Sequence, residues 1–117
     1  MEHRKYDRYP VEYVASFSGD SFGAQGIILD ISVIGCRARG VFAVKKDDYA
    51  SVLIDVPRYE RPLHVSLAVI RWSNGQEFGM EFIQMEPDDQ KRLRELIQAI
   101  KAAWVQRADP DDSMTLR

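Results

Sequence analysis

Cysteine and histidine are scarce in this sequence, and their scarcity excludes several classes of protein. The chain of 117 residues holds one cysteine, Cys36, and two histidines, His3 and His64. A lone thiol cannot build a disulfide framework, and these three residues lack the spacing of a zinc site, so Cys36 is expected to be a small buried apolar residue. Neither histidine stands beside a nucleophile with an orienting partner. We therefore expect a protein that is not an enzyme and holds no metal or cofactor.

Long apolar runs are also missing. Uninterrupted apolar runs such as residues 26–29 and 67–70 are far shorter than the ~20 residues that a membrane-spanning helix needs. No positively charged segment followed by an apolar stretch opens the chain, as a secretory signal would require. These absences predict a cytoplasmic protein that does not insert into a membrane. The length suits one globular domain, because a chain of this size buries roughly two thirds of its unfolded surface.

An excess of positive charge is the third absence. The formal net charge is −2, and it resides in the segment 109–117, which holds three aspartates and one arginine. A protein that binds duplex nucleic acid through its phosphates needs a basic face, which the electroneutral remainder does not provide. We therefore expect no duplex nucleic acid partner. An anionic ligand would have to be bound by a few placed arginines.

Polar and apolar residues alternate in the first part of the chain with the period of a β-strand. The predicted strands cover residues 11–18, 22–31, 36–44, 51–56, 63–72 and 77–84. One face of the fifth strand is predicted to carry Leu63, Val65, Leu67 and Val69. The last two strands are joined by Ser73-Asn74-Gly75-Gln76, and Asn-Gly favours a type I′ hairpin turn because both central residues of that turn have positive φ.

From Glu86 the apolar residues recur with the period of an α-helix. Pro87 suits the first position of a helix, and Asp88 and Asp89 suit its positive N-terminal end. One face of this amphipathic helix is predicted to carry Leu93, Leu96, Ile97, Ile100, Ala103 and Trp104. Regularly spaced antiparallel strands followed by one helix predict a mainly β fold, either a small β-barrel or a strongly coiled sheet, with the C-terminal helix packed against it.

Two short motifs stand out beside this framework. Arg4 and Arg8 form an R-x-x-x-R before the first strand, and Asp30, Ser32 and Gly35 form a D-x-S-x-x-G between the second and third. The first motif is expected by chance in a chain this rich in arginine, whereas the second is rare. Taken separately, the arginines are typical of solvated charges near a chain end. The other three residues are typical of a closed turn between strands.

Together the two motifs suit a guanine nucleotide. A guanidinium group offers a planar fork of donors that matches phosphate oxygens and the O6 and N7 acceptors of guanine, and it can stack on the base. The carboxylate of Asp30 complements the opposite edge of guanine, where N1–H and the amino group are donors. Ser32 can donate its hydroxyl to a phosphate, and Gly35 permits a close approach of the backbone to the ligand. Such recognition needs neither a catalytic base nor a metal.

At these residues the sequence resembles the PilZ family of bacterial cyclic-di-GMP receptors. Arg4 and Arg8 match the family's R-x-x-x-R, and the D-x-S-x-x-G residues match its second motif. A third match is residues 69–82, which resemble the family's penultimate hairpin ending in F-G-x-x-F. The resemblance covers about residues 3–100 and implies a six-stranded antiparallel β-barrel with a C-terminal helix.

The resemblance implies a role for each motif residue. Arg4 and Arg8 would bind guanine and phosphate groups of cyclic-di-GMP from a mobile arm that folds over the ligand. Asp30 would pair with a guanine edge, while Ser32 and Gly35 would line the barrel surface.

Trp72 stands where some members of the family place an aromatic side chain that stacks on a base. A buried tryptophan at the end of a strand is an equal alternative. Two departures from the family pattern leave details open. His3 precedes the first arginine, where the family's residue influences whether one ligand or an intercalated pair binds. The glycine often found ahead of the fourth strand is missing from residues 44–50, so that loop can differ in shape.

The chain is thus predicted to have three parts: a flexible ligand-binding arm (1–9), a PilZ-like barrel with its helix (10–107) and an acidic, disordered tail (108–117). The predicted function is that of a second-messenger receptor that binds cyclic-di-GMP and passes the signal to a separate downstream protein. The alternative is a ligand-independent PilZ-type adaptor. The intact motifs disfavour that alternative, because such members tend to lack them.

Overall fold

The computed structural model describes residues 6–20 and 22–108. The predictions that concern Arg4, His3 and the segment 109–117 therefore lie outside the described residues. Within them the elements, in chain order, are β1 (Tyr9–Gly19), β2 (Gly23–Ile31), β3 (Gly35–Arg39), β4 (Tyr49–Ile54), β5 (Leu63–Asn74), β6 (Glu77–Gln84) and α1 (Pro87–Ala108).

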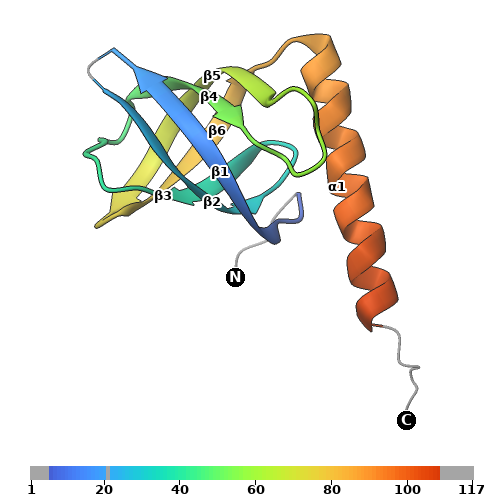
Figure 1. The fold of residues 1–117 in the computed structure, drawn as a ribbon. Coiled ribbons are helices and arrows are strands. Elements are labelled where there is room, and N and C mark those ends of the chain that lie inside the picture. Colours follow the sequence, from blue (N-terminus) through green and yellow to red (C-terminus); the bar gives the residue numbers. More distant parts are fainter. Residues whose placement is uncertain (1–5, 21, 109–117) are drawn as a thin grey trace.

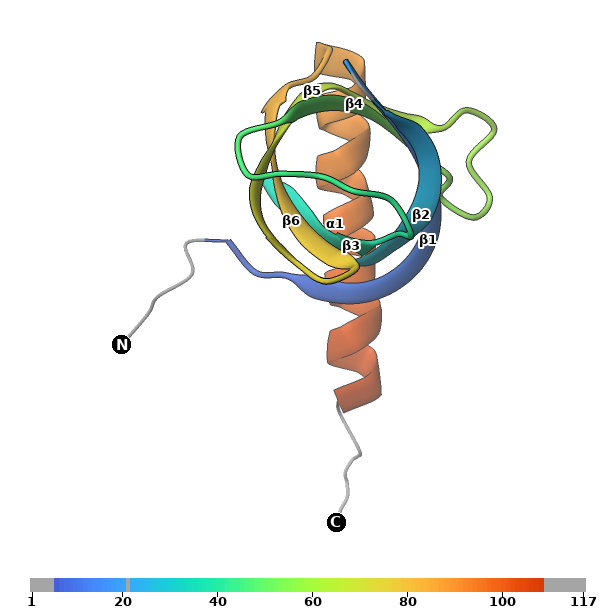
Figure 2. The same cartoon turned by 90° about the vertical axis from the view of Figure 1, so that its left-hand side faces the viewer.

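The strands of the described residues form a closed antiparallel barrel in the order β1-β2-β3-β6-β5-β4. Figure 2 looks along this barrel, and α1 crosses behind its opening. The predicted fold class, a mainly β six-stranded barrel with a C-terminal helix, is confirmed.

Alternation places one face of each strand inside the barrel. In β1, Ala15 and Phe17 are buried, whereas Val14 and Ser18 on either side of this pair are exposed. The interior is partly aromatic, because the ring centroids of Phe17 and Phe78 lie 5.5 Å apart and those of Phe17 and Phe42 lie 5.7 Å apart. A barrel of this size is narrow enough to be filled by its own side chains. Residues that bind a ligand must therefore lie on its outer surface or at its ends.

The fifth strand departs from the predicted alternation halfway along. Leu63 is buried as predicted, but Leu67 is only partly buried. Ala68 and Ile70 belong to the core cluster, and Val69, although only 4% exposed, lies outside it. The register with β4 shifts over this stretch, because Val65 pairs with Val52 and Ala68 pairs with Ala50, so β5 holds one more residue than β4 and forms a β-bulge. The predicted inner face was wrong beyond this point, because one extra residue turns the rest of the strand over.

The hairpin between β5 and β6 is present, but its turn is not of type I′. The two loop residues are Gly75 and Gln76, between the paired residues Asn74 and Glu77. Gly75 has a φ of 66°, and neither Asn74 nor Gln76 has a positive φ. Positive φ at the first central position alone is the type II′ pattern. Asn74 therefore ends the strand and does not belong to the centre of the turn.

The third strand is shorter than predicted, because β3 ends at Arg39 and not at Val44. Beyond Arg39 the chain leaves the sheet, and Phe42 packs its ring against the buried aromatic core. Figure 2 shows this segment passing across the opening of the barrel on the side away from α1. Phe42 thus helps to close one end of the barrel, and α1 closes the other.

The first turns of α1 are firmly attached to the barrel. Leu93 and Leu96 are buried in the same core as the strands. Oδ1 of Asp89 accepts a hydrogen bond of 3.1 Å from the backbone N–H of His64 and one of 2.9 Å from Nη1 of Arg92. Asp89 was predicted only to suit the helix dipole, and it also ties α1 to β5.

The last turns of α1 extend past the wall of the barrel (Figure 1). Ala103 and Trp104 continue the predicted apolar face, yet both are exposed, Trp104 by 46%. The Trp104 ring meets the ring of Tyr9 at a centroid distance of 6.3 Å. The predicted face is therefore buried only along its first half, where the barrel lies beneath it.

Candidate ligand-binding site

A groove of about 240 Å³ lies on the outer surface of the barrel, where β3, β6 and β5 run side by side. It brings together three of the predicted site residues, namely Arg8, Gly35 and Trp72. Its other lining residues are Ile34, Arg71, Gly79, Met80 and Glu81. We call this depression the Trp72 groove. Asp30 and Ser32 lie beside it, in contact with Arg8 and Gly35 respectively.

Asp30 is approached by arginines from two directions. Its Oδ2 accepts a hydrogen bond of 2.9 Å from Nε of Arg37, the residue opposite it on β3. Its Oδ1 lies 3.8 Å from Nη1 of Arg8, which is an ion-pair distance and too long for a hydrogen bond. Oδ1 is buried and accepts no hydrogen bond from the described residues. Asp30 is therefore held by Arg37, while its second oxygen keeps unused acceptor capacity beside Arg8.

Arg37 connects Asp30 to the neighbouring strand. Its Nη1 donates a hydrogen bond of 2.9 Å to Oε1 of Glu77 on β6. The hydrogen bond to Asp30 raises the pKa of Arg37 most, and the hydrogen bond to Glu77 raises it further, so the guanidinium stays charged. The Arg37 side chain is about one third exposed, and solvent screening makes such a pair weak as a source of stability. Its consequence is geometric, because two anchoring points fix the direction of the Asp30 carboxylate.

Ser32 is engaged in the turn between β2 and β3. Its Oγ accepts a hydrogen bond of 3.1 Å from the backbone N–H of Ile34 and makes a longer contact of 3.4 Å with the carbonyl oxygen of Gly35. The side chain is only 1% exposed. Within the protein, Ser32 therefore makes the contacts of a residue that closes the turn between two strands. Its hydroxyl proton is committed only to the longer of the two contacts.

Gly35 has a packing reason to be glycine. A Cβ at this position would collide with the backbone carbonyl of Met80, because β3 and β6 approach each other closely here. Its φ is not positive, so a left-handed conformation is not the cause. The glycine lets β3 begin against β6 and leaves the floor of the Trp72 groove open.

Trp72 lies on the surface, with its indole across Gly79. The two residues are paired between β5 and β6, and a Cβ at Gly79 would collide with the indole ring. Trp72 is 37% exposed. The alternative of a buried tryptophan is therefore wrong, and one part of the ring is available to a ligand. Stacking on a base is compatible with this position.

Arg71 adds a second guanidinium to the groove. Its Nε donates a hydrogen bond of 2.7 Å to Oε1 of Glu81 across the β5 and β6 pair, and both side chains are well exposed. The Trp72 groove thus combines cationic donors, a carboxylate with a free acceptor site beside it and an aromatic face. Such a set of groups binds a planar, anionic ligand by charge-assisted hydrogen bonds and stacking.

Cys36 lies in the core behind this region and is fully buried, as predicted. Burial raises the pKa of its thiol to about 12, and the nearby charge of Asp30 adds to the shift while Arg8 opposes it. The thiol is therefore uncharged at neutral pH and is not a nucleophile. Across residues 6–20 and 22–108, no three His, Cys, Asp or Glu side chains gather so as to hold a metal ion. No helix of the described chain is both long and apolar enough to cross a membrane.

Comparison with known proteins decides the family. The family model described as "PilZ domain" matches residues 2–99. The chain belongs to the PilZ family. By sequence, no curated protein matches it.

Solved PilZ structures share the fold of this chain. The PilZ domain of Escherichia coli YcgR with c-di-GMP superposes with a TM-score of 0.72 at 15% identity, over 92% of this chain and 98% of that domain. Full YcgR from Escherichia coli in complex with c-di-GMP gives a TM-score of 0.75 at 16% identity, over 92% and 50%. The Bacillus subtilis inhibitor of motility MotI gives 0.72 at 15% identity, over 92% and 54%. The PilZ chain described here thus spans about half the length of these last two proteins.

Several residues of this PilZ site were not predicted from the sequence. Arg37 contacts Asp30 only because β2 and β3 pair in one register, and Gly79 supports Trp72 only because β5 and β6 do. Arg71 is the sequence neighbour of Trp72, and this adjacency was the one feature of the sequence that could have indicated a place for Arg71 in the groove. Arg4 lies outside the described residues, so its position relative to the groove stays a prediction.

Proposed function

We propose that this PilZ protein is a receptor for cyclic-di-GMP and that the ligand binds in the Trp72 groove. The observation that carries the proposal is that Arg8 and Trp72, which are far apart in the sequence, line one exposed groove, with Asp30 beside it in ion-pair contact with Arg8. Membership of the PilZ family supports the same ligand, as does the likeness of the fold to YcgR, which has been solved with c-di-GMP.

The two arginines of the first motif supply the cationic donors. Nη1 of Arg8 lies 3.8 Å from Oδ1 of Asp30, and 31% of the Arg8 side chain is exposed. The guanidinium can therefore turn to a ligand in the groove with little rearrangement. A guanidinium can bind a phosphate through two parallel hydrogen bonds or the O6 and N7 edge of guanine. Arg4 is proposed to bind a second part of the same ligand from the segment that precedes Arg8.

Asp30 is proposed to bind the donor edge of guanine. When Arg8 turns to the ligand, Oδ1 of Asp30 loses its charged neighbour and can accept hydrogen bonds from N1–H and the amino group of guanine. Arg37 keeps the carboxylate pointed in the same direction throughout. This exchange replaces a loose ion pair by hydrogen bonds of better geometry.

Ser32 and Gly35 are proposed to contribute from the turn. The Ser32 hydroxyl can keep its bond from the Ile34 N–H and exchange the long contact with Gly35 for a phosphate oxygen. The absence of a side chain at Gly35 lets the ligand approach the backbone. Trp72 is proposed to stack on one base with its exposed face.

The output is proposed to pass to a separate partner protein in the cytoplasm, without any reaction catalysed by this chain. Ligand binding would order the segment that carries Arg4 and Arg8, and the loss of its conformational freedom is offset by charge-assisted hydrogen bonds. The reordered segment would change the surface that a partner meets.

Titration calorimetry tests the proposal with a matched pair of nucleotides. Cyclic-di-AMP carries the same phosphates as cyclic-di-GMP but lacks O6 and the N1–H donor of guanine. We expect saturable heat with cyclic-di-GMP and binding at least about tenfold weaker with cyclic-di-AMP, the loss expected for one unmade charge-assisted contact. The absence of heat with cyclic-di-GMP would reject the receptor and favour the ligand-independent adaptor.

A further inference from the structure

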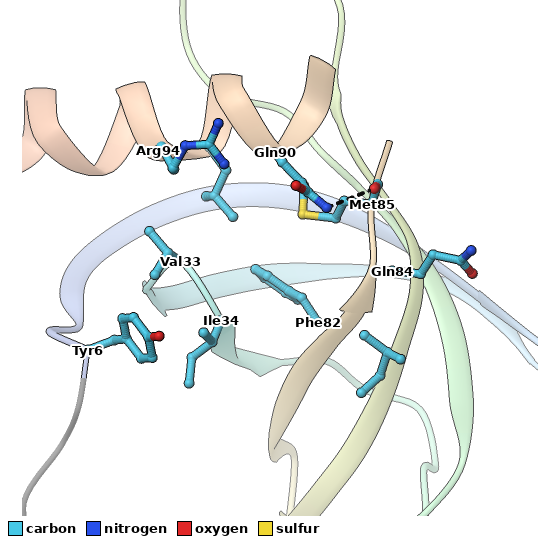
Figure 3. Close-up of a pocket in the computed structure, with 10 residues that line it drawn as sticks. Tyr6, Val33, Ile34, Phe82, Gln84, Met85, Gln90 and Arg94 are labelled. Atoms are coloured by element: carbon cyan, nitrogen blue, oxygen red, sulfur yellow. Dashed lines mark hydrogen bonds between the residues drawn. The ribbon is translucent and has the colours of Figure 1, made fainter. Parts of the chain in front are cut away.

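Two adjoining depressions lie between α1 and the rim of the barrel, and the first shares Ile34 with the Trp72 groove. The first has a volume of about 250 Å³ and lies against the first turns of the helix. The second, of about 230 Å³, lies further along the helix. Tyr6 and Val33 line both of them, so the two form one surface, which we call the helix groove. Figure 3 shows the first depression, with Tyr6 at one side and the helix above.

The walls of the helix groove are apolar and accessible. In the first depression Phe82 and Leu93 form the floor, and Ile34 and Ile83 are 43% and 48% exposed. Ile97 lines the second depression. Each depression is large enough for one bulky side chain. Exposed apolar walls of this kind are typical of surfaces that bind another protein.

The two depressions repeat along α1 with a spacing of one heptad. Gln90 and Arg94 line the first, and Ile97 and Lys101, each seven positions later, line the second. Seven residues of α-helix span about 10.5 Å. A helix lying beside α1 would therefore present one apolar side chain to each depression if those side chains were also seven positions apart.

The charged residues of the helix groove select the occupant. Arg94 and Lys101 are exposed at its edge, and neither has an ion-pair partner among the described residues. Opposing charges across an interface favour one partner and orientation over others. Asp7 also lines the second depression, so the groove carries two cations and one carboxylate, and this excess of positive charge favours an acidic segment.

We propose that the helix groove is the docking site for an amphipathic helix of a partner protein, with two large apolar residues seven positions apart and acidic residues beside them. Cyclic-di-GMP controls access to it through Tyr6, and this control rests on the function proposed above. Tyr6 lies at the junction of the two depressions and stands midway between Arg4 and Arg8 in the chain. Arg8 already lines the Trp72 groove, and a ligand there that also binds Arg4 repositions the segment between the two arginines and moves Tyr6 out of the helix groove, which opens it.

The test uses a fluorescent helical peptide that carries two leucines seven positions apart, each flanked by glutamates. A control peptide has the same composition with the leucines five positions apart. Anisotropy measures the affinity of the full chain for each peptide, and amide chemical shifts locate the site. We expect the first peptide to bind at least about tenfold more tightly than the control and to shift Val33, Ile34 and Ile97 most.

Charge reversal on the protein tests the choice of partner. Arg94→Glu combined with Lys101→Glu is expected to weaken the acidic peptide about tenfold, and a peptide with lysines in place of the glutamates is expected to regain that affinity. Lys91→Glu changes an exposed residue of the same helix that does not line the groove, and it is expected to have no effect. Equal effects of Lys91→Glu and of the double variant would overturn the site.

Ligand control is tested with Tyr6→Ala. Cyclic-di-GMP is expected to strengthen peptide binding to the parent about fivefold and to leave peptide binding by Arg8→Ala unchanged. Tyr6→Ala is expected to bind the peptide as tightly without ligand as the parent does with it. Three outcomes would overturn the docking site. The parent protein could fail to bind the peptide, or the peptide could shift amides elsewhere on the molecule. The protein could also associate with itself through Val33 and Ile97 when its concentration is raised.

The two proposals fail in different ways. If cyclic-di-GMP binds but Tyr6→Ala and the parent bind the peptide equally weakly, the docking site is wrong and the receptor stands. If cyclic-di-GMP gives no heat while Tyr6→Ala binds the peptide tightly, the docking site stands and the receptor is wrong.

Discussion

The Trp72 groove and each depression of the helix groove are similar in size, but they differ in the charged groups around them. The first holds about 240 Å³ and is surrounded by paired charges, whereas the first depression of the second holds about 250 Å³ between apolar walls. Ile34 lines both, and Arg8 and Tyr6 bring the same short segment of chain to each. Fixed charges suit a small polar ligand, and an open apolar wall suits a protein. One short segment of chain therefore borders both surfaces, which is what the proposed ligand control of the helix groove requires.

Replacement of Arg8 by alanine should affect the Trp72 groove most strongly. The change removes the donor that faces both the groove and Asp30, and it leaves Oδ1 of Asp30 buried without a charged neighbour. We expect cyclic-di-GMP to bind about a hundredfold more weakly, because one or two charge-assisted hydrogen bonds are lost. Titration calorimetry measures the change.

Arg94→Ala is the matched control for this prediction, since Arg94 lines the helix groove and does not line the Trp72 groove. Its affinity for cyclic-di-GMP should equal that of the parent. Equal losses in the two variants would show that overall charge, and not the position of Arg8, determines binding.

Gly35→Ala should break the close approach of strands that forms the Trp72 groove. The added Cβ collides with the carbonyl of Met80, and we expect the free energy of unfolding to fall by about 2 kcal/mol, as overpacking usually costs. Gly23→Ala is the control, because no atom lies within 4 Å of a Cβ there. Urea denaturation measures both variants. A loss for Gly23→Ala as large as that for Gly35→Ala would refute the packing explanation.

Arg37→Met should weaken the ligand indirectly, through the orientation of Asp30. The variant keeps much of the side-chain volume but removes the hydrogen bonds to Asp30 and Glu77. We expect about a tenfold loss of affinity for cyclic-di-GMP, which is the effect of one hydrogen bond to a charged group. Arg39→Met is the control, since Arg39 is exposed on the same strand and makes no ion pair with the described residues. Arg37→Lys should restore part of the affinity, and a full loss in Arg37→Lys would contradict a charge-based orienting role.

Trp72→Ala should produce the smallest change of the four. Loss of one stacked aromatic surface is expected to weaken cyclic-di-GMP about fivefold. Trp104→Ala is the matched control, because Trp104 is also partly exposed but lies on the overhanging part of α1 against Tyr9. The ligand should also quench the fluorescence of Trp104→Ala and leave that of Trp72→Ala unchanged. If the ligand quenched only the fluorescence of Trp72→Ala, the guanine base would not stack on Trp72.

The periodic elements of the fold were predictable from the sequence because each depends on neighbours in the chain. The six strands, the helix and the bounds of β6 follow from alternation and helical period. The bulge in β5 was not predictable, since Leu67, Ala68, Val69 and Ile70 are all apolar and fit either phase. The exposed end of α1 was missed for a similar reason, because periodicity does not reveal where the barrel beneath the helix ends.

The candidate site was predictable only where a motif names its residues. Arg8 and Gly35 line the Trp72 groove and Asp30 lies beside it, as their order in the motifs suggested. The orienting contact of Arg37 and the support of Trp72 by Gly79 come from strand register, which one sequence does not disclose.

Binding of cyclic-di-GMP in the Trp72 groove is tested most directly by an amide and indole chemical-shift titration of the isotope-labelled protein with this nucleotide. If the ligand binds in the Trp72 groove, the largest shifts will fall on the Trp72 indole N–H and on the amides of Gly35 and Gly79, which border the groove. Binding in the Trp72 groove would be contradicted if saturating ligand left these three signals unshifted, or if the largest shifts fell on residues on the far side of the barrel.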